Sequence, residues 1–257
     1  VSTSALTDLT EVTMTMMYRV RTMQIDAALV RRVTTVISVM WGGAILGGLI
    51  SFVTRVVLAR YMGPSEFGVF STAQTIVTLV SPLAGFGVAR FWLKVFGAEG
   101  WGAIRWLPAS LGFAVVSTVV TVGIVAFWAL AAPHTDYERV VILTMSVYVL
   151  GQVAMELVSG RLQLEERFSY LTTWQLLPQV LRLVIVVAIA YLFTDWMTAV
   201  GVSVGYAVAS LAILCMGVHL LWQMMRGEMD LKGHPPRSGE FESGKVRVFG
   251  VVRESWP

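Results

Sequence analysis

The sequence predicts an all-α, polytopic membrane protein with six transmembrane helices. Hydrophobic residues make up 56% of the 257 residues and charged residues only 14%, and the mean hydropathy is +0.72. In a soluble globular domain about a quarter of the residues are charged, and they cover its surface. The apolar residues also gather in runs of about 20, the length that an α-helix needs to cross the ~30 Å hydrocarbon core of a bilayer. Lipid is therefore the expected solvent for most of the chain.

Six such runs follow one another, and turn-forming or charged residues separate them. Two runs contain one charged residue each, Glu156 in the fourth and Arg182 in the fifth. The expected spans are residues 33–56, 67–89, 106–132, 139–160, 169–193 and 196–224. A membrane β-barrel would instead show strands of ~10 residues with alternating polarity, which these runs lack. The chain thus divides into an N-terminal arm (1–32), a six-helix lobe (33–225) and a polar tail (226–257).

The basic residues of the short connections predict the orientation of these helices, because Lys and Arg are enriched on the cytoplasmic side. If the N-terminus is cytoplasmic, the opposite side holds Arg55, Arg60 and Arg139, Arg182 lies within a span, and all other Lys and Arg residues fall on the cytoplasmic side. We therefore expect a multi-pass protein of the inner (cytoplasmic) membrane with both termini in the cytoplasm. The polar tail, rich in Pro and Gly, is expected to be a cytoplasmic linker or a disordered segment.

Composition and spacing also argue against several classes of protein. The single cysteine, Cys215, lies in an apolar run, so neither a disulfide framework nor a Cys-based metal cluster is expected. The three histidines are scattered, and the sequence has no phosphate-binding loop or nucleophile elbow. The longest internal connection, residues 90–105, is too short for a catalytic domain. Because the basic residues lie at helix ends and not in one patch, we expect no nucleic-acid partner. Because these motifs and a catalytic domain are missing from the sequence, we also expect no enzyme activity, metal or cofactor.

A polar face on the fifth span is the strongest candidate for a functional site. Gln175, Gln179 and Arg182 follow i, i+4, i+7 spacing and so share one face of the helix. Arg182 lies ~18 Å deep at ~1.5 Å per residue, where a charge costs ~2.5–3.5 kcal/mol. Pro178 in the same stretch frees a backbone carbonyl one turn earlier. Two interpretations are open: an anion-binding wall of a translocation cavity, or an arginine that reaches the interface or pairs with a neighbouring helix.

Other polar positions are weaker candidates for the same site. Tyr148, Gln152 and Glu156 repeat at helical spacing in the fourth span. Glu156 is either a cavity carboxylate or an interfacial one, and its expected depth differs from that of Arg182 by ~10 Å, which disfavours a direct pair. Arg55, at the outer end of the first span, faces either a vestibule or lipid headgroups. The candidate cavity residues are therefore Arg182, Gln179, Gln175, Glu156, Gln152 and Arg55.

Two stripes predict how the first two spans pack. Gly43, Gly47 and Ser51 repeat every four residues in the first span, which is the small-xxx-small pattern of close helix packing. The second span carries hydroxyl groups and a proline on one face, at Ser71, Thr75, Thr78 and Pro82. This second stripe either lines a cavity and allows a bend, or forms hydrogen bonds between helices.

Three segments resemble signature sequences of a known family. Residues 57–70, VLARYMGPSEFGVF, resemble the loop between the first two helices of polysaccharide flippases. Residues 82–88 are similar to the end of their second helix, and residues 160–168 are similar to the loop between their fourth and fifth helices. The three segments occur in the family's order. The chain therefore resembles the multidrug/oligosaccharidyl-lipid/polysaccharide exporter superfamily, in its O-antigen-type branch.

The resemblance implies an architecture and a function. Members of that branch have two six-helix lobes around a central, often cationic cavity, and they export pyrophosphate-linked lipid oligosaccharides by alternating access. This chain would be the N-terminal lobe of such a protein, as a truncated version or a fragment. Its partners would be membrane lipid, the lipid-linked oligosaccharide, and a second lobe or a second copy of the chain. Two alternatives stay open: one lobe of a cation-coupled multidrug exporter, for which Glu156 is the candidate carboxylate, or a non-transporting membrane subunit or inactive remnant.

Overall fold

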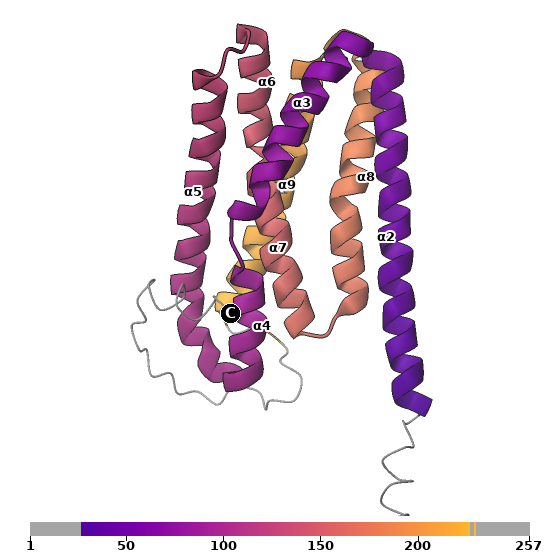
Figure 1. The fold of residues 1–257 in the computed structure, drawn as a ribbon. Helices are drawn as coiled ribbons and strands as arrows, with labels where there is room; N and C mark the ends of the chain where they lie inside the picture. The colour runs from indigo at the N-terminus through magenta and orange to yellow at the C-terminus, as the bar shows by residue number, and fades with distance from the viewer. Residues whose placement is uncertain (1–26, 227–228, 230–257) are drawn as a thin grey trace, which may run out of the picture. The chain divides into compact units, whose positions relative to one another are not determined.

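The computed structural model describes residues 27–226 and Met229, and every regular element among them is helical (Figure 1). The α-helices are α2 (Ala27–Met62), α3 (Pro64–Val80), α4 (Val88–Glu99), α5 (Leu107–Ala131), α6 (Asp136–Ser146), α7 (Tyr148–Leu164), α8 (Phe168–Leu192) and α9 (Ala199–Met225). Short 3-10 helices are η1 (Ser81–Leu83), η2 (Gly100–Trp106) and η3 (Thr194–Trp196). Contacts divide the chain within α2, into a unit up to Gly42 and a unit from Gly43, and the second unit is the helical lobe. Most of the predicted N-terminal arm and polar tail lies outside the described residues.

The described helices confirm an all-α, polytopic membrane protein. Within the described residues, five stretches are long and apolar enough to cross a membrane: Thr34–Met62, Pro64–Ala131, Asp136–Leu164, Phe168–Leu192 and Ala199–Met225. The second stretch has 68 residues, and as one straight helix it would measure ~100 Å, about three times the thickness of the bilayer core. Instead, η2 turns the chain so that α5 runs back alongside α3 and α4 (Figure 1). One crossing by α3 with α4 and another by α5 would give the six predicted spans, a number that stays a prediction.

The predicted span 67–89 is not one continuous helix. α3 ends at Val80, and η1, which contains Pro82, follows it. Gly85 and Gly87 then take φ values of 71° and 70°, which glycine adopts without the steric cost that other residues meet. The N–H of Gly85 donates a hydrogen bond to Ser117 Oγ at 2.9 Å, which fixes the break against α5. The sequence predicted that Pro82 could allow a bend, and in the structure the helix is fully interrupted at this place.

Residues 90–105, expected as a connection, form most of α4 and the η2 turn. The buried side chains of α4 repeat at helical spacing, at Val88, Phe91, Trp92 and Val95. The Trp92 Nε1 also donates to Ser110 Oγ at 2.7 Å. This is an amphipathic helix, with Arg90 and Lys94 outside its buried stripe. The prediction was wrong here because these two charges end the uncharged run, although the apolar spacing continues past them.

α7 and α9 pack with their backbones in close contact. A Cβ added to Gly151 of α7 would lie 2.9 Å from Ser210 Cβ and 3.0 Å from Ser210 Cα in α9. Further along, a Cβ added to Gly217 of α9 would lie 2.9 Å from Ala154 Cβ in α7. Small residues at a helix crossing allow this approach, which membrane helices use because the hydrophobic effect does not drive them together in lipid. The stretch that contains α7 and the stretch formed by α9 are the two most buried of the five apolar stretches.

The small-residue stripe in the first span faces α8. A Cβ added to Gly43 would overlap Thr172 Cγ2 of α8, and one added to Gly47 would lie 3.4 Å from Leu176 Cδ2. The Ser51 hydroxyl donates a hydrogen bond to Gln179 Oε1 at 2.8 Å. The small-xxx-small face therefore lies against α8 through side-chain contacts, whereas the backbones of α2 and α8 approach each other less closely than those of α7 and α9.

Glu66, in the segment that resembles the flippase signature, joins three helices. Its Oε2 accepts a hydrogen bond from the Tyr137 hydroxyl at the start of α6, and another from the Ala199 N–H at 2.7 Å at the start of α9. Pro64 occupies the first turn of α3, where the missing N–H costs nothing, and Gly63 before it has a φ of 77°. The segment thus fixes one end of the lobe.

A buried ion pair closes the turn between α7 and α8, in the segment 160–168. Arg161 is 6% exposed and Glu165 is 2% exposed, and Arg161 Nε donates to Glu165 Oε1 at 2.9 Å. The Arg161 Nη1 also donates to the carbonyl oxygen of Leu220 in α9. Arg167 Nε lies 3.4 Å from the second oxygen of Glu165. The segment therefore ties the end of α7 to α9 through charges that the sequence placed in the loop between the fourth and fifth spans.

Candidate functional site

A polar cavity of about 590 Å³ opens between α2, α3, α7, α8 and α9. Its lining consists of Ser51, Thr54, Arg55, Gln74, Thr75, Thr78, Leu79, Pro82, Tyr148, Gln179, Arg182 and Tyr206. Among these lining residues, all of which the structure describes, there are two arginines and no acidic side chain. The charge of the lining therefore favours an anion.

Arg182 is the buried charge of this cavity, with only 8% of the residue exposed. Its guanidinium carbon lies 4.6 Å from the centre of the Tyr148 ring and 5.6 Å from the centre of the Tyr206 ring. A cation over an aromatic face gains ~0.5–2 kcal/mol, so the two rings offset part of the cost of burying the charge. The Nε is buried without a hydrogen-bond partner, and none of the ion pairs between described residues includes Arg182. The described residues hold this charge in place without neutralising it.

Helix packing brings the second ring to Arg182. A Cβ added to Gly205 of α9 would lie 2.6 Å from Ile185 Cγ2 and 3.2 Å from Ile189 Cδ1, both in α8. The glycine therefore lets α8 approach α9 at the residue just before Tyr206. Tyr148 comes from the other side, as the first residue of α7 after the break at Val147. The cradle of Arg182 is thus assembled from three helices.

A second polar cavity, of about 490 Å³, shares Thr78, Pro82 and Tyr148 with the first. Its remaining lining residues are Ser81, Gln152, Met155, Glu156, Ser159 and Gln175. A Cβ added to Gly85 would lie 4.0 Å from Glu156 Oε2, which places this carboxylate beside the break between α3 and α4. In the part of the chain that the structure describes, no three His, Cys, Asp or Glu side chains are grouped as metal ligands.

The six residues selected from the sequence line these two adjoining cavities. Arg55, Gln179 and Arg182 lie in the first, and Gln152, Glu156 and Gln175 lie in the second. Glu156 and Arg182 form no ion pair within the described residues, in agreement with their different expected depths. The structure therefore brings the candidates together, while their role in binding stays a prediction.

The hydroxyl stripe of the second span lines a cavity. Thr75 and Thr78 belong to the first lining, and their hydroxyls donate to the carbonyls of Ser71 and Gln74 in the same helix, at 2.8 and 2.7 Å. The alternative interpretation, hydrogen bonds between helices, is wrong for these two residues.

Tyr206 is the functional candidate that the sequence did not select. It is the single tyrosine of the predicted span 196–224. At ~1.5 Å per residue it lies ~10 Å from the start of α9, while Arg182 lies ~15 Å from the end of α8, and these two ends are joined by a short connection. Comparing the depths of polar residues on consecutive spans could therefore have paired the two.

Comparison with known protein families gives a match: the family described as "Polysaccharide biosynthesis protein" matches residues 33–257 of the chain. The match includes the whole helical lobe and every residue that lines the two cavities. It also includes all three segments that carry the resemblance. No curated protein and no solved structure matches the chain.

Proposed function

We propose that this chain, which belongs to the polysaccharide biosynthesis protein family, moves lipid-linked oligosaccharides across the cytoplasmic membrane by alternating access. Membership of the family supports a role in polysaccharide biosynthesis or export, and its members are transporters. The observation that carries the more specific proposal is Arg182. It is a buried cation on the wall of a polar cavity, and no carboxylate neutralises it among the described residues.

A pyrophosphate group on the substrate would supply the missing negative charge. The planar donors of a guanidinium match the oxygens of phosphate, and charge-assisted hydrogen bonds of this kind are about twice as strong as neutral ones. Arg55 in the same lining adds a second positive charge. The Gln179 amide keeps its N–H donors for sugar hydroxyls, because its oxygen accepts the bond from Ser51.

The two cavities together would form the path for the polar part of the substrate. They follow α7 from Tyr148 to Ser159, ~16 Å or about half of the bilayer core. In this proposal the lipid tail stays in the bilayer, and both termini of the chain lie on the cytoplasmic side of the inner membrane. A second lobe, or a second copy of the chain, would cover the path and rock against this lobe.

Replacing Arg182 by Ala is expected to lower the rate of translocation at least ten-fold, and Arg182→Lys is expected to keep part of it, because a point charge remains. The measurement is the appearance of lipid-linked oligosaccharide in the opposite leaflet of proteoliposomes that contain the purified protein. Arg139→Ala is the matched control, since Arg139 pairs with the exposed Asp136 and lies outside both cavities. Equal translocation by Arg182→Ala and the wild type, at equal reconstitution and melting temperature, would remove Arg182 from the mechanism.

A second candidate function is cation-coupled drug export. The observation that favours it is Glu156, the acidic residue in the linings of the two cavities. A membrane-embedded carboxylate can bind a proton or a sodium ion. This alternative predicts that Glu156→Gln abolishes uptake of a lipophilic cation driven by a proton or sodium gradient. The lipid-linked sugar proposal predicts that the same variant retains most of its sugar translocation. The two assays, run on one preparation, separate the two functions.

A further inference from the structure

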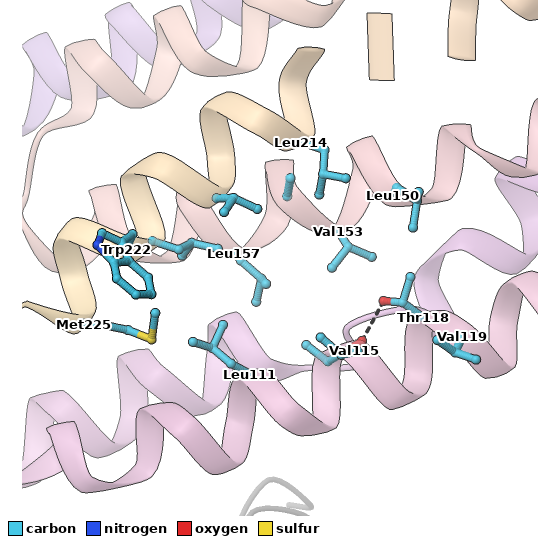
Figure 2. Close-up of a pocket in the computed structure, with 14 residues that line it drawn as sticks. Leu111, Val115, Thr118, Val119, Leu150, Val153, Leu157, Leu214, Trp222 and Met225 are labelled. Carbon is cyan, nitrogen blue, oxygen red and sulfur yellow. Dashed lines mark hydrogen bonds between the residues drawn. The ribbon is translucent and has the colours of Figure 1, made fainter. Parts of the chain in front are cut away.

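An apolar groove of about 360 Å³ lies between α5, α7 and α9 and shares no lining residue with the polar cavities (Figure 2). α7 contributes Leu150, Val153 and Leu157, which share one helix face at i, i+3, i+7 spacing. The walls come from α5, with Val115 and Val119 among others, and from α9, with Leu214 and Trp222 (Figure 2). Each helix therefore turns one continuous apolar face to the same groove.

The groove offers almost no hydrogen bonding to an occupant. Thr118 lines it, but its hydroxyl donates to the Ala114 carbonyl of its own helix at 2.6 Å (dashed in Figure 2). Val115 and Val119 on the α5 wall are 64% and 65% exposed, so the groove is open along this wall. Such a surface fits a hydrocarbon chain.

One end of the groove carries a cation. The guanidinium carbon of Arg226 lies 5.5 Å from the centre of the Trp222 ring, which is itself part of the lining. Arg226 is exposed, and none of the ion pairs between described residues includes it. Tryptophan and arginine at the end of a span lie at the level of the lipid headgroups. The charge is therefore placed where a phosphate would lie if a chain occupied the groove.

The length of the groove matches one leaflet. Its α9 wall runs from Leu214 to Met225, which is ~16 Å at ~1.5 Å per residue. Half of the ~30 Å hydrocarbon core is ~15 Å. We propose that the groove is a binding site for one anionic phospholipid, with an acyl chain between α5 and α9 and the phosphate at Arg226. This inference does not use Arg182 or the polar cavities, so it stands or falls separately from the proposed transport function.

The test is a lipid titration of the purified full chain in detergent, followed by native mass spectrometry. Dioleoyl phosphatidylglycerol is expected to bind at least five-fold more tightly than dioleoyl phosphatidylcholine, because only the former carries a net negative charge. Val115→Trp, which fills the groove, is expected to weaken phosphatidylglycerol binding at least five-fold. Val116→Trp is the matched control, since Val116 is 60% exposed on the same helix but does not line the groove. Arg226→Gln is expected to reduce the preference for phosphatidylglycerol, whereas Arg60→Gln, at the end of α2, is expected to keep it.

Position is checked with one fluorescent label in a Cys215→Ser background, which removes the single natural cysteine. Brominated phosphatidylglycerol in detergent is expected to quench a label at Val119→Cys more strongly than one at Val116→Cys. Equal binding of both lipids by the wild type, or wild-type binding by Val115→Trp at an unchanged melting temperature, would overturn the proposal. Displacement of phosphatidylglycerol by a long isoprenoid phosphate, or by a second copy of the chain, would overturn the choice of occupant.

Discussion

Glu165→Ala is expected to lower the free energy of unfolding by about 3–5 kcal/mol, the usual cost of removing one partner of a buried ion pair. Arg161 and Glu165 are 6% and 2% exposed, and 2.9 Å separates Arg161 Nε from Glu165 Oε1. Without the carboxylate, Arg161 keeps other partners, among them the carbonyl of Leu220 and the side-chain oxygen of Gln223, but it loses the charge-assisted bond to Glu165. The loss is expected to loosen the turn after α7, because the guanidinium that Glu165 holds in place also donates to α9.

The measurement is equilibrium or thermal unfolding of the purified protein in detergent. Glu99→Ala is the matched control, because the Arg105–Glu99 pair has a similar distance, 3.0 Å, but its side chains are 46% and 35% exposed. An exposed pair contributes ~0–1 kcal/mol, so this control is expected to change stability little. Glu165→Gln should lie between the two, since it keeps the volume and an oxygen acceptor. If Glu165→Ala and Glu99→Ala were equally stable, the buried pair would not hold the turn.

The membrane class followed from composition, because lipid imposes long uncharged runs that a single sequence reveals directly. The α4 helix did not follow, since Arg90 and Lys94 interrupt the uncharged run without interrupting the helix. The same rule assigned Arg161 and Glu165 to the loop between the fourth and fifth spans. Charge marks where a span ends, but it does not show whether the charged residues are exposed or are paired and buried. That difference depends on contacts with α9, almost sixty residues further along the chain.

The site was partly predictable for a related reason. Polar residues within apolar spans are rare, so the face of Gln175, Gln179 and Arg182 stood out in the sequence. Its surroundings did not, because Tyr206 reaches Arg182 through the close approach of α8 and α9 at Gly205. Glycine in a membrane helix is common, and the sequence does not say which neighbour it faces. Partners across helices therefore had to come from the structure.

The crossing of α7 and α9 gives the second large expected effect. Gly151→Val is expected to destabilise the protein by about 3 kcal/mol, at the upper end of the cost of overpacking, because Ser210 Cα lies 3.0 Å from the first added atom and a backbone atom cannot rotate away. Gly123→Val in α5 is the matched control, since an added Cβ there meets nothing within 4 Å. Unfolding in detergent compares the two variants.

The same substitution is expected to reach the site. Tyr148 lies three residues before Gly151, and Tyr206 lies four residues before Ser210, so both rings around Arg182 lie about one helical turn from this crossing. Forcing α7 and α9 apart would separate the rings and loosen the arginine between them. Gly151→Val is therefore expected to lower both stability and translocation, and adding Ser210→Gly, which removes the nearest Cβ, is expected to restore part of both. A stable Gly151→Val protein with wild-type translocation would mean that the crossing of α7 and α9 accommodates the larger side chain and does not set the position of Arg182.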